Sequence, residues 1–169
     1  MFREVVRDKR QIIDRSVCDE ILEKASSGVL SVLGDNDYPY GVPMSFAYKD
    51  NRLYFHCMPY GHKLDAMKKH DKVNFTIIET DNIVPEEYAT YFRSVIVFGR
   101  ARMVTNSQEK IELHDILIRK YSPDFVEGAY EKFKDRIEMM GAFVVEIDHV
   151  SGKEAIEFAA PGWNINDQL

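Results

Sequence analysis

Six short strand-like runs dominate the sequence between residues 29 and 150. The runs span residues 29–33, 42–48, 53–58, 72–79, 94–104 and 141–150. They are rich in β-branched and aromatic residues, as strands usually are, and Gly, Asp and Asn separate the first three runs. The close turns at 34–37 and 49–51 predict that these three strands form an antiparallel meander.

The predicted strands carry apolar residues on both faces, so both faces need cover. A small closed barrel covers one face with its own interior, and helices or a partner subunit cover the other. The chain has 169 residues, about the length of one domain. We therefore expect one mainly β domain over 1–169, a six-stranded antiparallel barrel with peripheral helices. Its core spans about 28–150, and 151–169 form a C-terminal tail.

Two helices with clear apolar periodicity are expected beside the strands. Ser16-Val17-Cys18-Asp19 has the pattern of a capping box, and apolar spacing after it predicts a short amphipathic helix over about 17–26. A second helix is predicted over 107–120, with Leu113 or His114 on its inner face.

Composition limits the classes of partner. The 22 Lys and Arg residues against 28 Asp and Glu give a formal charge of −6, which disfavours nucleic acid as a main partner. No apolar run approaches the ~20 residues of a membrane-spanning helix. Two cysteines, Cys18 and Cys57, and no secretory leader favour the reducing cytoplasm. A small phosphorylated cofactor needs only a few well-placed cations and remains compatible with this charge.

A candidate phosphate site follows the third predicted strand. The chain turns through Pro59 and Gly61 and enters a short helix predicted over 62–70. Free backbone N–H groups at a helix start attract anions, and His62 and Lys63 add donors there. The alternative is a solvated lysine beside an incidental histidine, and the spacing alone leaves both open.

Four segments carry a family resemblance: 38–43 (YPYGVP), 53–57 (LYFHC), 61–65 (GHKLD) and 94–101 (SVIVFGRA). In order and with matching turns, they resemble the nitroimidazole-resistance (Nim-type) proteins of the pyridoxamine-5′-phosphate-oxidase-like superfamily of FMN-binding split barrels. The resemblance covers roughly residues 28 to 150. It implies a homodimer that holds FMN at the subunit interface.

The resemblance also implies which residues bind the cofactor. His62 and Lys63 occupy the positions of the basic pair that holds the phosphate. The second-strand residues Val42, Pro43, Met44 and Ser45 would run along the flavin ring, and the third-strand residues His56 and Cys57 would lie near the ribityl chain and phosphate. Ser94 would supply a polar contact from the other subunit, and Trp163 would lie near the ring.

Three of these residues also have structural interpretations, and for Cys57 the structural one is favoured. His56 alternates with Tyr54 and fits a core or interface histidine as well as a functional one. Cys57 has no basic neighbour in sequence and fits a small buried hydrophobe. Trp163, the only tryptophan, fits a packing anchor of the tail as well as a residue beside the ring.

A homodimer is also expected from apolar content. The strands present more apolar surface than one barrel interior of this size is expected to take, and exposed apolar patches usually mark interfaces. The residues behind this expectation are Phe55, Phe75, Ile77, Val95 and Val97.

The predicted function is FMN-dependent reduction of a small molecule such as a nitro-aromatic, with electrons from NAD(P)H or a partner. Oxidation of pyridoxamine phosphate is not expected, because no arginine follows Arg136. The alternative is a non-catalytic flavin- or haem-binding module for storage or sensing, with His56 or His62 as iron ligand. The sequence identifies no catalytic residue, and its five histidines show no metal-ligand spacing.

Overall fold

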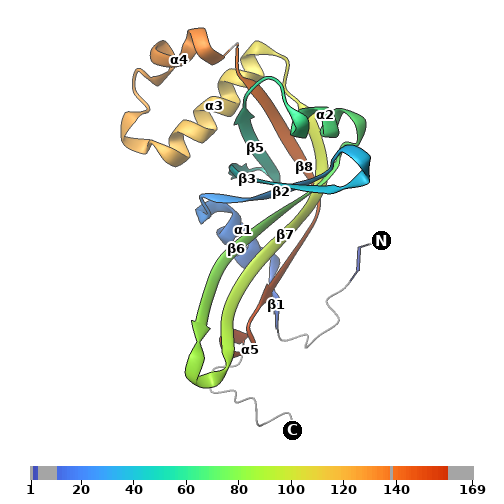
Figure 1. Cartoon of the computed structure of the whole chain (residues 1–169). Coiled ribbons are helices and arrows are strands. Elements are labelled where there is room, and N and C mark those ends of the chain that lie inside the picture. Colours follow the sequence, from blue (N-terminus) through green and yellow to red (C-terminus); the bar gives the residue numbers. More distant parts are fainter. Residues whose placement is uncertain (1, 4–10, 138, 160–169) are drawn as a thin grey trace.

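The computed structural model describes residues 2–3, 11–137 and 139–159, which form an antiparallel sheet flanked by helices (Figure 1). The strands are β1 (Ile12–Ile13), β2 (Ser27–Leu33), β3 (Pro39–Ser45), β4 (Ala47–Lys49), β5 (Arg52–Cys57), β6 (Lys72–Val84), β7 (Ala89–Met103) and β8 (Gly141–Glu154). The helices are α1 (Arg15–Lys24), α2 (His62–Lys69), α3 (Ser107–Tyr121), α4 (Ala129–Ile137) and α5 (Ile156–Ala159). None of these helices is long and apolar enough to cross a membrane.

The strand order is β3-β2-β6-β7-β8-β5-β4, with β1 paired to β8. The first and last strands of this order, β3 and β4, are consecutive in the chain and are separated only by Phe46. Because Phe46 connects the two outer strands, the sheet curls into a barrel. The expected mainly β barrel is confirmed, with more strands than the six predicted.

The predicted antiparallel pairing of 42–48 with both neighbouring strands is confirmed, but this run forms two strands rather than one. β3 pairs with β2, from Ser27↔Ser45 to Leu33↔Pro39, whereas β4 pairs with β5 on the other side of the barrel. The chain changes partner at Phe46, whose side chain is fully buried. Burial of this ring in the interior explains why the run reads as one apolar strand in sequence.

The barrel interior is built around aromatic rings. The rings of Phe55 and Phe143 stack with centroids 4.6 Å apart, and Phe75 meets Phe46 edge-on at 4.8 Å. Pairs of this kind stabilise a core beyond the area that they bury. Around these rings pack further strand residues and the inner faces of α1 and α2.

The apolar residues expected at a dimer interface are instead inside the barrel. Phe55, Phe75, Ile77, Val95 and Val97 are all fully buried within one chain. These five residues therefore do not supply a dimer interface, because the pleat of each strand directs alternate side chains into the barrel interior. Exposed apolar residues on the described strands are Ile12, Val29, Ile78, Ile83 and Phe98, of which Val29, Ile78 and Phe98 lie on β2, β6 and β7 of the barrel.

β6 and β7 continue well beyond the predicted strands as a hairpin that projects from the barrel (Figure 1). The segment 83–93, which the predicted strands leave out, is paired from Ile83↔Thr90 to Thr80↔Arg93. A short 3₁₀ turn, Pro85–Glu87, closes the hairpin, and its end is exposed. The strand prediction missed these pairs because Pro85-Glu86-Glu87 interrupts the apolar run, and no residue of 83–93 is buried in the core.

The predicted capping box is also wrong. α1 begins at Arg15 after Asp14, and no side chain caps it. The Asp19 carboxylate, expected to reach back to Ser16, instead accepts hydrogen bonds from Arg15 Nε (2.8 Å) and from the Tyr48 hydroxyl (2.7 Å). These bonds tie α1 to β4.

The predicted helix over 107–120 is confirmed as α3. Asn106 caps it by accepting a hydrogen bond from the Glu109 N–H, and the buried residues of α3 are Leu113, His114 and Leu117. α4, which was not predicted, packs against α3 at one end of the barrel, and α3 contacts β5 (Figure 1). These two helices enclose the cavities described below.

Candidate functional site

The turn from β5 into α2 forms one end of the candidate site. Gly61 precedes α2 with φ +126°, a conformation that side-chain-bearing residues rarely adopt, and no side chain caps the helix. His62 and Lys63 are the first residues of α2, and Lys63 is half-buried. The first turn therefore presents uncapped N–H groups beside a partly buried cation, as anion sites require.

His62 is held by the neighbouring turn. Its Nε2 accepts a hydrogen bond from the backbone N–H of Asp35 at 3.1 Å, and its ring stacks on Tyr40 of β3 at 4.4 Å. An imidazole nitrogen that accepts an N–H carries no proton, so a neutral His62 carries its proton on Nδ1. The Asp35 carboxylate lies 3.6 Å from Nε2 and also pairs with Lys69. His62 therefore joins α2 to β3 and is a weaker anion ligand than a free cation.

Lys63 has a different environment. Among the described residues, no carboxylate lies within ion-pair distance of its ammonium group. It lies close enough to Cys57 to act on the thiol electrostatically, yet burial dominates and raises the Cys57 pKa. The Cys57 thiol thus stays protonated at neutral pH, which fits a packing role, and Lys63 remains available to a ligand.

β3 forms a second part of the site. It pairs with β2 on one side and ends the strand order, so its other edge has no strand partner among the described residues. Val42 and Met44 are half-buried, while Pro43 and Ser45 are exposed. Pro43 has no N–H to donate, as expected of an edge strand. The open edge can accept a flat ligand along its backbone.

A cavity of about 310 Å³ lies beyond the end of β3. Ser45 and His56 line it together with residues of α3 and α4. The imidazoles of His56 and His114 stack with centroids 5.6 Å apart. Partial burial lowers the pKa of His56, and nearby His114 lowers it further, so His56 is neutral at pH 7 although part of its surface is exposed.

His114 is a site residue that the sequence did not single out. It is 6% exposed, its Nδ1 lies 2.7 Å from the Lys110 carbonyl oxygen, and its Nε2 has no partner in the described part of the chain. The available signal was a polar residue on the inner face of an amphipathic helix. That pattern gives no hint of the missing partner.

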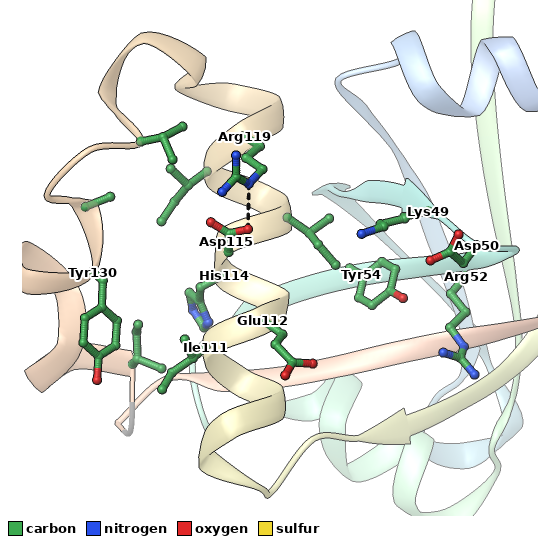
Figure 2. A pocket seen from close by; sticks show the side chains of 15 residues that line it. Lys49, Asp50, Arg52, Tyr54, Ile111, Glu112, His114, Asp115, Arg119 and Tyr130 are labelled. Carbon is green, nitrogen blue, oxygen red and sulfur yellow. Dashed lines mark hydrogen bonds and ion pairs between the residues drawn. The ribbon is translucent and has the colours of Figure 1, made fainter.

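A larger cavity of about 660 Å³ lies between α3, α4 and the turn joining β4 to β5 (Figure 2). Charged side chains of both signs line it, and Arg119 Nε pairs with Asp115 at 2.7 Å. Lys49, Asp50 and Arg52 stand on the opposite wall from these two (Figure 2). Charges of both signs on its walls are typical of a solvated cleft, and no predicted cofactor residue lines it.

The family model for pyridoxamine 5′-phosphate oxidase matches residues 14–154. The chain belongs to this family. A curated relative, the uncharacterized protein RA0666 of Rhizobium meliloti (strain 1021), is 29% identical over 153 residues, covering 86% of this chain and 95% of that protein.

Two solved structures show how the fold of this pyridoxamine 5′-phosphate oxidase family member recurs. A Bacteroides thetaiotaomicron protein, provisionally named as a 5-nitroimidazole antibiotic resistance protein, has a TM-score of 0.71 and 23% identity over 85% of this chain and 86% of its own. An FAD-binding protein from Mesorhizobium loti has a TM-score of 0.63 and 25% identity over 85% of this chain and 96% of its own.

The fold of this family member brings most predicted residues together, but not all. His62 stacks on Tyr40 of β3, Lys63 lies near Cys57 of β5, and Ser45 and His56 line one cavity. Ser94 lies on β7, which β2 and β6 separate from β3 in the sheet. Trp163 falls outside the described residues. No group of three or more potential metal ligands occurs among the residues described.

Proposed function

We propose that this chain binds FMN between β3 and the start of α2 and uses it to reduce a small acceptor. The observation that carries the proposal is Lys63, a half-buried cation without a carboxylate partner among the described residues, at an uncapped helix start. A buried or half-buried charge is costly unless a ligand or ion pair compensates it. A phosphate group supplies that compensation.

In this proposal β3 would hold the flavin ring. His62 stacks on Tyr40, so the proposed phosphate end lies at one end of β3. From Tyr40 to Ser45 the strand extends about 16 Å at 3.3 Å per residue. A phosphate at Lys63 thus leaves the flat ring along the backbone of Val42, Pro43, Met44 and Ser45, with His56 and Cys57 beside it. The FAD-binding name of the Mesorhizobium relative supports a flavin.

The proposal includes a second copy of the chain. Ser94 cannot reach β3 of its own chain across two intervening strands, which fits a role on the partner's flavin. Ser94 is paired with Ile78, which is 68% exposed. An isologous contact through this face would cover Ile78, Val29 and Phe98 and complete the site with Ser94.

When bound, the flavin supplies the hydride and electron transfer, and the protein supplies binding, orientation and electrostatics. No described residue is assigned as a catalytic acid or base. The nitroimidazole-resistance name of the Bacteroides neighbour supports a nitro-aromatic as acceptor. The two cysteines are free thiols, which supports a reducing, cytoplasmic location.

Absorption spectra of the purified protein, with titrations of FMN, FAD and riboflavin, test the proposal. We expect a flavin spectrum, and tighter binding of FMN than of riboflavin. A haem spectrum, or no binding of any flavin at micromolar concentration, would exclude the proposed cofactor. Anaerobic NAD(P)H oxidation with a nitro-aromatic acceptor then separates an enzyme from a binding module.

Trp163 is proposed to lie near the bound flavin, from its sequence position alone. Because it is the only tryptophan, its emission reports on this directly. FMN should quench the emission at saturation. Unchanged emission would place Trp163 away from the ring.

A further inference from the structure

The β6–β7 hairpin extends beyond the strands that flank it in the described part of the chain. On one side, β2 pairs with β6 only from Ser31↔Asn74 to Val29↔Thr76, and on the other side the pairing of β8 with β7 ends at Glu154↔Arg93. Residues 80–93, which we call the arm, therefore form a two-stranded ribbon that projects from the barrel (Figure 1). A hairpin of two strands is marginally stable in water by itself, so the arm needs cover on its faces.

The chain itself covers one face of the arm. The ring of Phe158, in α5, meets Tyr91 edge-on with centroids 5.8 Å apart, and the Arg93 guanidinium lies 5.0 Å from the centre of the Phe158 ring. Tyr91 and Arg93 share this face because side chains alternate along a strand. Val95 and Val97 continue the same face into the barrel interior, where both are fully buried.

The opposite face of the arm continues the outer face of the barrel. On β7, Phe92 lies on the same face as Ser94, since the two are separated by one residue. The pairs Ile78↔Ser94 and Ile83↔Thr90 place both isoleucines on this face, because directly opposed residues of paired strands share a face. Ile78 is 68% exposed and Ile83 is 70% exposed, so this face carries uncovered apolar side chains in the described part of the chain.

The charge of the arm selects the kind of partner. The arm carries three carboxylates, Asp81, Glu86 and Glu87, and its only cation, Arg93, is paired with a β8 carboxylate at 2.8 Å. Nucleic acid and acidic membrane surfaces repel such a ribbon. A protein surface with positive charge fits it, and the chain has one at 63–72, in α2 and the first residue of β6. This segment holds four lysines against two aspartates, although the formal charge of the whole chain is −6.

We infer, resting on the proposed dimer with Ser94 at the partner's flavin, that the arm of each copy packs on the other copy with its acidic end against α2. Ser94 stands at the base of the arm, so the outer face of the arm continues along the partner from that point. Ile83 is paired with Thr90, four residues beyond Ser94, which corresponds to about 13 Å of strand. This length is comparable with the roughly 16 Å of β3 between Tyr40 and Ser45, so one arm is long enough to border the flavin site as far as α2.

Photo-cross-linking from the end of the arm tests this contact. Tyr88 is 97% exposed, so benzoylphenylalanine in its place should leave the fold intact. In a mixture of ¹⁵N-labelled and unlabelled full-length chains, irradiation should join two copies, and the cross-linked peptide should come from 62–72 of the second copy. The control is the same probe in place of Phe125, which is exposed between α3 and α4 at the other end of the molecule from the arm (Figure 1). It should yield single chains.

Charge reversal gives a second measurement. Glu86→Lys combined with Glu87→Lys should weaken the dimer by about ten-fold or more in sedimentation, because it places lysines against the lysines of α2. Asp124→Lys combined with Glu127→Lys is the matched control, since both residues are exposed and the change in formal charge is the same. The control should leave the dimer unchanged, and equal effects of the two double substitutions would contradict the contact.

The cross-linking outcomes also separate the arm contact from the proposed cofactor. Cross-links confined to one chain, or to a part of the second copy outside 62–72, would overturn the inference, as would a wild-type monomer. FMN binding by a protein whose arm cross-links only within its own chain refutes only the arm contact. Cross-links to 62–72 in a protein that binds no flavin refute only the proposed cofactor.

Discussion

The hydroxyl of Tyr121 lies 3.0 Å from the backbone nitrogen of Phe46 and 2.6 Å from its carbonyl oxygen. It also lies 2.6 Å from the Ser26 carbonyl oxygen. Phe46 is the residue at which the chain leaves β3 for β4, so its backbone groups have no place in either strand ladder. One side chain at the end of α3 therefore satisfies the polar backbone at the split of the barrel.

Tyr121→Phe should destabilise the protein by about 1–2 kcal/mol, since it leaves the Phe46 N–H without its acceptor. Urea unfolding should show a lower midpoint with an unchanged m-value. Tyr130→Phe is the matched control, because Tyr130 is 48% exposed on α4 and should shift stability by less than about 0.5 kcal/mol. Equal effects of the two substitutions would contradict the role given to Tyr121.

Lys120, next to Tyr121, predicts a pH dependence. Its ammonium lies 2.6 Å from the Ala25 carbonyl oxygen and 4.3 Å from the centre of the Phe46 ring, and burial lowers its pKa to about 8. In the unfolded chain the pKa is near 10.5, so the unfolded state binds more protons between pH 8 and 10.5. Stability from this group therefore increases as pH rises through that window.

The free energy of unfolding of wild type minus that of Lys120→Met isolates this group. We expect the difference to move in favour of wild type by on the order of 2 kcal/mol between pH 7 and pH 10.5. The Tyr121 pKa is raised by burial in both proteins, so its titration cancels in the difference. A pH-independent difference would show that Lys120 keeps its ordinary pKa.

Elements with strong local signals were predictable from the sequence. α3 has regular apolar spacing and a capping asparagine, and its bounds agree with the prediction to one residue. The break at Phe46 was not predictable, because an apolar residue within an apolar run gives no sign that the strand changes partner. Only the pairings of β3 with β2 and of β4 with β5 reveal it.

Lys63→Ala should weaken FMN binding by about ten- to a hundred-fold, since a hydrogen bond to a charged group contributes about 1.5–3 kcal/mol. Riboflavin, which lacks the phosphate, should bind with nearly unchanged affinity. Lys68→Ala is the control on the same helix, because Lys68 is exposed and pairs with Asp65. His62→Phe should cost less than Lys63→Ala, since His62 accepts from Asp35. Equal losses for FMN and riboflavin would remove Lys63 from the phosphate site.

The site was predictable only where a family pattern or helix position marked it. The sequence placed His62 and Lys63 together as a basic pair. It could not show that the Asp35 backbone N–H donates a hydrogen bond to His62 Nε2, because the two residues are 27 positions apart. His114 was placed on the right face of α3. Its unpartnered Nε2 depends on packing against β5 and α4, which no local pattern encodes.

The protein should sediment as a dimer at micromolar concentration, and Ile78→Glu should shift it toward monomer. Ile78 is 68% exposed opposite Ser94, and a charge placed in an apolar interface is strongly unfavourable. Met139→Glu is the control, because Met139 is 66% exposed near α4, away from this face. A wild-type monomer would contradict the dimer and with it the proposed role of Ser94.

Despite its family, the protein should not oxidise pyridoxamine phosphate. A phosphorylated second substrate needs a cation beside the flavin, and the cavity next to Ser45 is lined by no charged residue among those described. No arginine follows Arg136, and Lys153, the only lysine in that part, lies over the Phe92 ring on β7. Peroxide release from pyridoxamine phosphate should therefore stay far below ~1 per second, a low value for an enzyme. As a control, the bound FMN should be reduced by dithionite and reoxidised by air. If this redox cycle works, a lack of turnover is due to the missing site for the substrate phosphate and not to an inactive flavin. Turnover at ordinary enzymatic rates would show that a cation outside the described residues completes it.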